Sequence, residues 1–297
     1  MDSLRGKLAL LTGAGGGLGS EMARALGREG VQLALSGRGE AALRRLAAEL
    51  AESGVRCVTL PADLSDREQV GGLVARAEEA LGPLDILVNN AAVEVCSSFE
   101  QLREDDIERI VQVNLTAPLV LSRDAASRML ERGSGHIVFV SSLSGYAGTA
   151  YESPYAATKG ALITLSRSLR AEYIDSPLRF SVVSPGSAGG RGMFARGQAE
   201  GIRVPRALRL TTPQAVARSL VETVRDDVPE AIVYPGPIRP ALMLGLVAPR
   251  LAERLNERLG LGRLFGPVAE ARGTLGSGRV VRARRRGPGS QDQLLRS

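Results

Sequence analysis

The sequence predicts an α/β protein, with a doubly wound parallel sheet in a single domain and a C-terminal helical extension. Short apolar runs alternate with longer amphipathic segments through most of the chain, and this alternation is typical of a parallel sheet that helices cover on both faces. The 297 residues, 44% of them hydrophobic and 24% charged, allow a core of full domain size. Residues suited to turns or ligands end several runs, where such sheets bind ligands. They are Gly13, Gly37, Asp63, Asn89, Ser142 and Pro185.

The order of the elements follows from the apolar runs. The expected strands cover residues 7–12, 31–36, 55–60, 85–88, 135–141, 178–183 and 231–233. The expected helices cover residues 20–29, 40–52, 66–81 and 104–132, a segment beginning near Ser153, and residues 212–225. Pro118 follows Asn114 within the fourth of these helices, so we expect a kink or disturbed hydrogen bonds there, because proline lacks a backbone N–H. Residues 187–210, rich in Gly and Arg, are expected to form a mobile flap over a cleft.

Composition and motifs predict three parts of the chain, residues 1–240, 241–270 and 271–297. The first part holds the sheet, and the second has Leu251, Leu255 and Leu259 at a spacing typical of an amphipathic helix, which should end near Gly260. The third has seven arginines, one acid and few apolar residues, so we expect a disordered, solvated basic tail. Because this tail accounts for the whole formal net charge of +6, the body is neutral.

Composition also argues against several classes of site. Aromatic residues make up 3% of the chain and Trp is absent, which disfavours stacking platforms for nucleic acid. Cys57 and Cys96 lack a CxxC or histidine pattern, so neither a disulfide framework nor a metal site is expected. The one histidine, His136, begins a strand and is assigned a structural role. The N-terminus enters a strand at once and no apolar run approaches about 18 residues, which predicts a cytoplasmic protein.

The stretch from Ser142 to Lys159 carries the strongest catalytic signal. Ser153 and Pro154 are typical of a helix N-cap and first helical residue, so Tyr155 and Lys159 should lie on one face of the helix that follows. Lys159 is one of only two lysines among 38 basic side chains. An ammonium about 4 Å from the phenol would lower a pKa that normally lies near 10. A YxxxK pattern also occurs by chance in helices, so the pair alone does not establish catalysis.

Two further features suggest a dinucleotide. The turn TGAGGGLG at residues 12–19 joins the first strand to a helix, and Gly13, Gly17 and Gly19 would let the backbone approach a pyrophosphate at the helix N-terminus. The alternative is a plain glycine-rich turn. Arg38 stands where an NAD-specific chain usually has an acid, and its guanidinium would favour a 2′-phosphate, hence NADP(H) over NAD(H). The alternative is a solvated arginine at a strand end.

Together these motifs resemble the short-chain dehydrogenase/reductase family over roughly residues 7–234. The shared motifs are TGxxxGxG, NNA after the fourth strand, a helical Asn, a Ser thirteen residues before YxxxK, and PG after the sixth strand. The resemblance implies a Rossmann-like fold and hydride transfer between a nicotinamide cofactor and a carbonyl or secondary alcohol. It also implies a small-molecule substrate and a homodimer or homotetramer.

The resemblance assigns roles to particular residues. Tyr155 would be the acid/base, Ser142 would hold the substrate oxygen, and Lys159 would lower the phenol pKa and bond the nicotinamide ribose. Asn114 would fix a water that links Lys159 to solvent. The cofactor-binding residues would be Gly13, Gly17, Leu18, Gly19, Arg38, Asp63, Leu64, Asn89, Ala91, Tyr155, Lys159, Pro185 and Gly186. The substrate pocket would contain Glu94, Cys96, Leu143, Tyr151, Met193 and Phe194.

Several positions depart from the family pattern. Ala92 replaces the usual Gly of NNAG, Gly190 stands where a Thr often contacts the carboxamide, and Gly16 leaves Arg38 as the one basic residue for a 2′-phosphate. After Tyr234 the usual ending is replaced by the extension. Its leucine stripe could be covered by the parent domain, a second subunit or a membrane surface. Two other functions therefore stay open: a non-catalytic dinucleotide-binding regulator, and a membrane-surface or interaction protein that uses the C-terminal helix.

Overall fold

Seven parallel strands form the sheet that the alternating pattern predicts. The computed structural model describes residues 3–190, 193–205, 208–261 and 264–272. The strand order is β3-β2-β1-β4-β5-β6-β7, and every neighbouring pair is parallel. The order reverses between β1 and β4, where sheets of this kind open a crevice for a ligand. The strands are β1 (Leu8–Leu11), β2 (Gln32–Gly37), β3 (Cys57–Pro61), β4 (Ile86–Asn89), β5 (Gly135–Val140), β6 (Leu178–Pro185) and β7 (Glu230–Val233).

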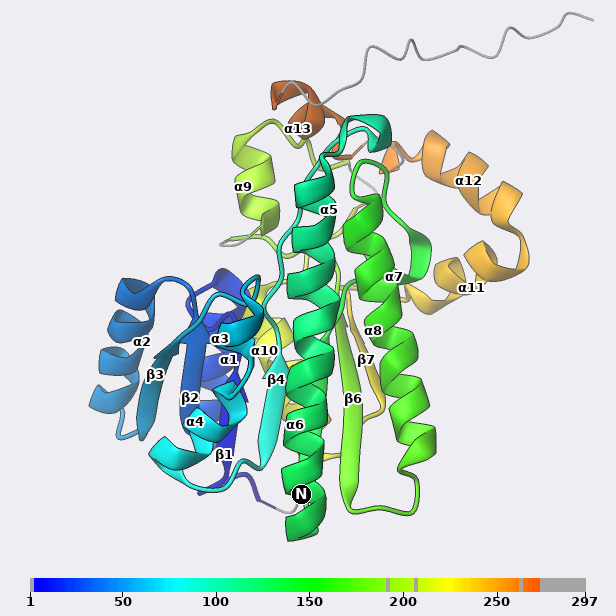
Figure 1. The fold of residues 1–297 in the computed structure, drawn as a ribbon. Helices are drawn as coiled ribbons and strands as arrows, with labels where there is room; N and C mark the ends of the chain where they lie inside the picture. Colours follow the sequence, from blue (N-terminus) through cyan, green and yellow to red (C-terminus); the bar gives the residue numbers. More distant parts are fainter. Residues whose placement is uncertain (1–2, 191–192, 206–207, 262–263, 273–297) are drawn as a thin grey trace, which may run out of the picture.

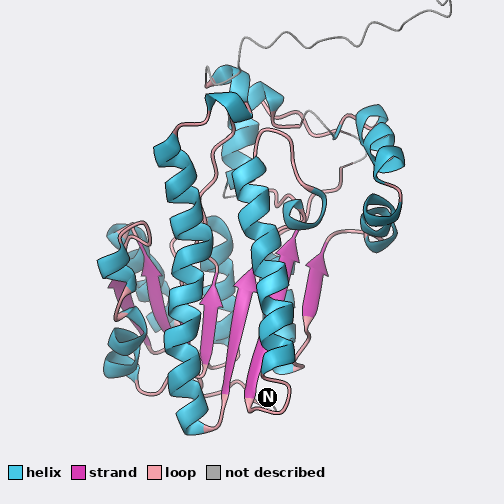
Figure 2. Ribbon diagram, turned by 45° about the vertical axis from the view of Figure 1, so that its right-hand side comes forward, coloured by secondary structure: helices cyan, strands magenta, loops and turns pink. Residues whose placement is uncertain are grey.

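Helices cover both faces of this sheet (Figures 1 and 2). Along β1, Ala9 and Leu11 join the apolar cluster on one face, and Leu8 and Leu10 join the cluster on the other, because successive strand side chains point to opposite faces. The first face is covered by α1 (Gly17–Arg28), α2 (Glu40–Glu52) and α10 (Pro213–Arg225). The second face is covered by α4 (Leu73–Leu81), α6 (Ala117–Arg132) and α8 (Ser153–Glu172).

The segment expected as one long helix is interrupted at Asn114. Helix α5 (Glu104–Val111) is joined to α6 by a π-helical turn, η2 (Gln112–Thr116). Pro118 lies in the first turn of α6, where a missing N–H is least costly. The disturbance expected from this proline is therefore confirmed.

Two helix boundaries differ from expectation. The helix expected at residues 66–81 divides into α3 (Arg67–Val70) and α4, because Gly72 adopts a left-handed φ of 76° between them. Helix α8 begins one residue earlier than expected, so that Ser153 lies inside it and Glu152 takes the N-cap position. The Glu152 side chain does not cap the helix, since its carboxyl turns into the interior beside the Cys96 thiol.

The C-terminal extension lies beyond the carboxyl ends of the strands (Figure 1). It forms α11 (Arg239–Val247), α12 (Pro249–Arg258) and α13 (Gly266–Ala271), so helical structure begins before residue 241 and continues past residue 270. The α12 stripe is not covered by the parent domain: Leu251, Leu255 and Leu259 are 54%, 43% and 40% exposed. None of the described helices is both long and apolar enough to span a membrane.

The region expected to be a mobile flap contains a packed helix. Helix α9 (Met193–Ala199) places Phe194 edge-on to Phe265, with ring centroids 6.3 Å apart. Arg272, the first arginine of the expected tail, is paired with Glu200 at 2.6 Å. These contacts attach α9 to the α13 region, while the rest of the tail, residues 273–297, lies outside the described residues. Two short elements complete the chain, η1 (Phe99–Gln101) and α7 (Ser144–Ala147).

Gly19→Ala is expected to lower the free energy of unfolding by about 1–3 kcal/mol. A Cβ at Gly19 would lie 2.2 Å from the carbonyl oxygen of Gly13, a backbone atom that cannot move without opening the turn. Urea unfolding followed by circular dichroism measures the change. Gly245→Ala in α11 is the matched control, because its Cβ would meet nothing within 4 Å, and we expect it to keep or slightly raise stability. Equal stability of the two variants would contradict the prediction.

Candidate active site

A cavity of about 930 Å³ lies at the carboxyl ends of the strands, near the upper end of the range usual for ligand sites, about 300–1,000 Å³. It runs from the turn after β1, past the end of β5 and the start of α8, to the inner side of α11 and α12. Most of the residues expected at the site line it. These are Gly13, Gly17, Leu18, Arg38, Asp63, Leu64, Ala91, Glu94, Ser142, Leu143, Tyr155, Lys159, Pro185, Gly186, Met193 and Phe194.

The glycine turn has the shape of a phosphate cradle. Gly13 has a left-handed φ of 67°, and a Cβ there would come within 2.9 Å of the Ala91 Cα atom. The residue before α1 is Gly16, which offers no side-chain cap to the N-terminal N–H groups of the helix. Bare backbone donors at a helix N-terminus favour an anion such as a pyrophosphate. The residues present therefore fit a dinucleotide at this end of the cavity.

Arg38 and Asp63 stand together beyond the ends of β2 and β3. Arg38 is exposed, lines the cavity and contributes to lowering the pKa of the Asp63 carboxyl. Partial burial raises the pKa of Asp63, but hydrogen bonds from the Ser65 N–H at 2.9 Å and hydroxyl at 2.8 Å, together with the charges of Arg38 and Arg109, give a net lowering. Asp63 is thus a fixed anion, while the Arg38 guanidinium is open to a ligand.

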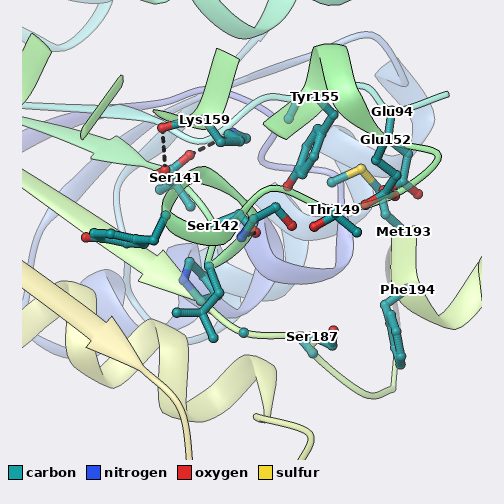
Figure 3. Close-up of a pocket in the computed structure, with 18 of the residues that line it drawn as sticks. Glu94, Ser141, Ser142, Thr149, Glu152, Tyr155, Lys159, Ser187, Met193 and Phe194 are labelled. Carbon is teal, nitrogen blue, oxygen red and sulfur yellow. Dashed lines mark hydrogen bonds between the residues drawn. The ribbon is translucent and has the colours of Figure 1, made fainter. Parts of the chain in front are cut away.

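Ser142, Tyr155 and Lys159 lie together at the end of β5 and the start of α8 (Figure 3). The Ser142 hydroxyl and the Tyr155 phenol point into the same part of the cavity (Figure 3), and the Ser142 hydroxyl accepts the Ser144 N–H at 3.2 Å. Lys159 Nζ donates to the carbonyl oxygen of Val140 at 2.8 Å and lies 5.6 Å from the centre of the Tyr155 ring. Tyr155 is 8% and Lys159 2% exposed, so a proton donor and a cation are held in a nearly dry wall of the cavity.

The structure corrects the expected electrostatics of this pair. Burial raises the pKa of the Tyr155 phenol above its usual range, the carboxylates of Glu152 and Glu94 raise it further, and the hydrogen bond from Ser142 partly offsets them. Burial lowers the pKa of Lys159 to about 8. The ammonium is bound to Val140, so in this arrangement the phenol pKa lies above its ordinary value and not below it as we expected.

Two carboxyl groups face the phenol, and the sequence motifs pointed to only one of them. Glu152 is buried, lines the cavity with Glu94, and its carboxyl lies 3.5 Å from the Cys96 sulfur. Burial, followed by the charge of Glu94, raises the pKa of Glu152 to about 8. The acid three residues before Tyr155 was visible in the sequence, but nothing there indicated that it would turn inward.

Five expected site residues do not line the cavity: Gly19, Asn89, Cys96, Asn114 and Tyr151. Gly19 packs beneath the glycine turn, so its role is close backbone packing. Cys96 and Tyr151 belong to a small apolar cluster with Phe194 and Phe265, behind the cavity wall. Asn114 is fully buried and bonds both backbone groups of Val93, at 2.8 Å each.

The Asn pair after β4 divides its two side chains between different neighbours. Asn89 is buried and donates to the Ser122 hydroxyl of α6 at 3.0 Å, so it does not line the cavity in which we expected it to contact the cofactor. Asn90, to which the sequence motifs assigned no role of its own, lines the cavity and donates to the carbonyl oxygen of Thr12 at 2.8 Å. Strand alternation explains the exchange, because consecutive side chains point to opposite faces.

The single histidine and the two cysteines do not line the cavity that contains Tyr155. His136 in β5 is buried and its Nε2 lies 2.9 Å from the Ser181 hydroxyl, while burial lowers its pKa to about 4. Both cysteines are free thiols, and burial raises the pKa of each. Among the described residues, no group of three or more His, Cys, Asp or Glu side chains is placed to hold a metal ion.

Comparison with known proteins identifies the family. The family model for short chain dehydrogenases matches residues 7–196. A ketoacyl reductase, HetN of Nostoc sp., is 32% identical over 88% of this chain and 92% of its own length. The actinorhodin polyketide ketoreductase solved with NADPH superposes with a TM-score of 0.71 at 28% identity, covering 79% of this chain and 98% of that one. A short-chain dehydrogenase/reductase from Burkholderia phymatum in complex with NAD gives 0.75 at 25% identity, covering 84% and 96%. The chain belongs to the short-chain dehydrogenase/reductase family of NAD(P)-dependent oxidoreductases.

Proposed function

We propose that this enzyme transfers hydride between NADP(H) and a carbonyl or secondary alcohol, with Tyr155 as the acid/base. The observation that carries the proposal is the shared cavity, in which the glycine turn lies at one end and Ser142 and Tyr155 lie further along the same wall. Gly13, Gly17 and the N-terminus of α1 would hold the pyrophosphate. When bound, the nicotinamide supplies or accepts the hydride, and the chain's own residues handle position and the proton.

The proton on the substrate oxygen is the task of Tyr155 and Ser142. In the reducing direction the phenol donates its proton to the oxygen as the carbonyl becomes an alcohol, and in the oxidising direction the phenolate takes that proton back. The Ser142 hydroxyl lies beside the phenol in the lining of the cavity (Figure 3), so an oxygen placed between them would meet two hydrogen-bonding groups at once. Holding the oxygen there fixes the orientation of the reacting carbon.

Lys159 would serve as a buried cation beside this oxygen. Its ammonium keeps a proton at neutral pH, because burial lowers its pKa only to about 8. A Lys in this position can also release and regain a proton, which Arg cannot. We assign it to the ribose side of the cofactor and to stabilising negative charge that develops on the phenol, a charge that the Glu152 and Glu94 carboxylates oppose.

The preference for NADP(H) rests on Arg38. Its guanidinium lies at the edge of the cavity beyond β2, where the 2′ position of the adenosine ribose would reach. Structures similar to this chain have been solved with NADPH and with NAD. A carboxylate at this position would repel a 2′-phosphate, whereas the exposed arginine would pair with it.

A regulator that only binds the dinucleotide fits this site less well. Such a protein needs the glycine turn but has no use for a buried phenol placed next to a serine hydroxyl and a buried ammonium. Burying Tyr155 and Lys159 imposes a desolvation cost on both groups. A role in proton transfer would account for this desolvation cost, so we favour the catalytic function over the regulatory one.

Tyr155→Phe is expected to lower kcat at least about 100-fold, because it removes the group that moves the proton. The ring still packs in place, so the Kd of NADPH, measured by fluorescence titration, should stay close to that of the parent protein. Tyr173→Phe is the matched control, since Tyr173 packs on Phe180 in the core away from the cavity. Turnover by Tyr155→Phe at the parent rate would refute the assignment.

Arg38→Ala is expected to raise the KM for NADPH about tenfold or more while leaving the KM for NADH nearly unchanged, because only the phosphorylated cofactor loses a charged hydrogen bond. Initial rates with each cofactor in turn measure the effect. Arg44→Ala provides the control, since Arg44 is an exposed arginine on α2 that pairs with Glu40. Equal changes in the KM values for NADPH and NADH would show that Arg38 does not determine the cofactor preference.

Glu152→Gln is expected to shift the pH profile of alcohol oxidation to lower pH, by about one unit or less. The phenolate is the base in this direction, so the rate rises as pH passes the phenol pKa. Glu152 has a pKa of about 8 and is therefore charged in the alkaline range, where it raises the pKa of Tyr155. The profile of kcat/KM against pH measures the shift. Glu131→Gln, an exposed change on α6, should leave the profile in place, and the same profile for all three proteins would contradict the prediction.

A further inference from the structure

The cavity that contains Ser142 and Tyr155 does not end at the catalytic wall. It continues along the inner side of α11 and α12, where its lining is dominated by large apolar side chains. These include Leu242, Leu244, Leu246, Leu255, Leu259 and Leu261. A single open space therefore joins the proton-transfer group to an apolar wall supplied by the extension.

This wall is open to solvent although it is apolar. Leu246 is 74% exposed, and Leu255 and Leu259 are also exposed. Contiguous exposed apolar surface is unfavourable in water, and it commonly marks a binding site. Because these leucines border a cavity that leads to Tyr155, something that reaches the catalytic centre is the natural occupant.

The charges along the lining favour an uncharged occupant. Among the described residues, the cations of the lining are Arg38 at the cofactor end and Lys159 beneath the phenol. Near the phenol the lining instead carries the carboxyls of Glu94 and Glu152, and along α12 it carries Glu253. A carboxylate or phosphate on the substrate would meet these acids there, and the described cation of the lining nearby, Lys159, is already bound to the Val140 carbonyl, so the wall suits hydrocarbon.

We propose that the substrate carries its carbonyl or secondary alcohol on a long hydrocarbon chain, which lies against the apolar wall of α11 and α12. This inference rests on the proposed function and names the substrate class of the same site. The reacting carbon sits at Ser142 and Tyr155, and the chain extends towards Leu246 and Leu255. The extension thereby acts as a chain-binding element that the rest of the domain lacks.

The first test is the dependence of rate on chain length, from 2-butanone to 2-dodecanone with NADPH. Each methylene that leaves water should raise kcat/KM up to about fourfold, until the chain outgrows the wall. A series that is turned over with no dependence on length would overturn the inference and leave the proposed function intact. The opposite case, in which the proposed function fails but the chain still binds, is tested by calorimetry on Tyr155→Phe loaded with NADP⁺. There 2-dodecanone should bind at least tenfold more tightly than 2-butanone, whether or not the parent protein turns either ketone over.

The second test uses two leucines of the same helix. Leu255→Asp places a charge in the wall. It should lower kcat/KM for 2-dodecanone at least tenfold, so that kcat/KM depends less on chain length. Leu251→Asp is the matched control: Leu251 is exposed on α12 but does not line the cavity, so the dependence should survive. Equal loss in both variants, accompanied by a change from dimer to monomer in light scattering, would assign the wall to a second copy. Equal loss of pelleting with anionic vesicles would assign it to a membrane surface, and either result would overturn the proposal.

Discussion

The position of α8 against the end of β5 is the constraint on which the site depends. Lys159 Nζ donates to the carbonyl oxygen of Val140 at 2.8 Å, and the Ser141 hydroxyl donates to the carbonyl oxygen of Lys159 at 2.7 Å. Gly145 lets α7 lie directly on α8, since a Cβ there would come within 2.7 Å of the Lys159 backbone. One side chain and one helix are thus fixed to the strand that delivers Ser142, which is why the phenol and the serine meet.

That same anchoring sets up opposing electrostatic effects at the phenol. Burial and two neighbouring carboxylates raise the pKa of Tyr155, while the Ser142 hydrogen bond acts to lower it. A phenol held in its neutral form is able to donate a proton to a carbonyl oxygen at neutral pH. Oxidation needs the phenolate and is favoured as the pH rises. The lysine contributes a fixed cation, and its bond to Val140 fixes where that charge lies.

The sequence predicted the sheet and the grouping of Ser142, Tyr155 and Lys159 because both depend on local patterns. Short apolar runs, a glycine turn and the Tyr155–Lys159 spacing can each be recognised within a few consecutive residues of the sequence. What it missed depends on which way a side chain turns or on packing between distant segments. Asn89 and Asn90 exchange roles through strand alternation, and Glu152 turns inward to a Cys96 that is distant in sequence. For the extension, the sequence predicted one amphipathic helix with an apolar stripe. It did not predict that three helices form there or which surface they border.

The lining of the cavity differs in polarity and charge between its two ends. Backbone N–H groups of the glycine turn and the Arg38 guanidinium favour anions at one end, which would direct the cofactor phosphates there and leave the other end for the substrate. Carboxyls flank the centre, where they oppose a second anion, and leucines of α11 and α12 form the far wall. Because the two ends differ in charge as well as in shape, we expect cofactor and substrate to approach Tyr155 from opposite sides. The Tyr155 phenol lies where the polar part of the cavity gives way to the apolar part.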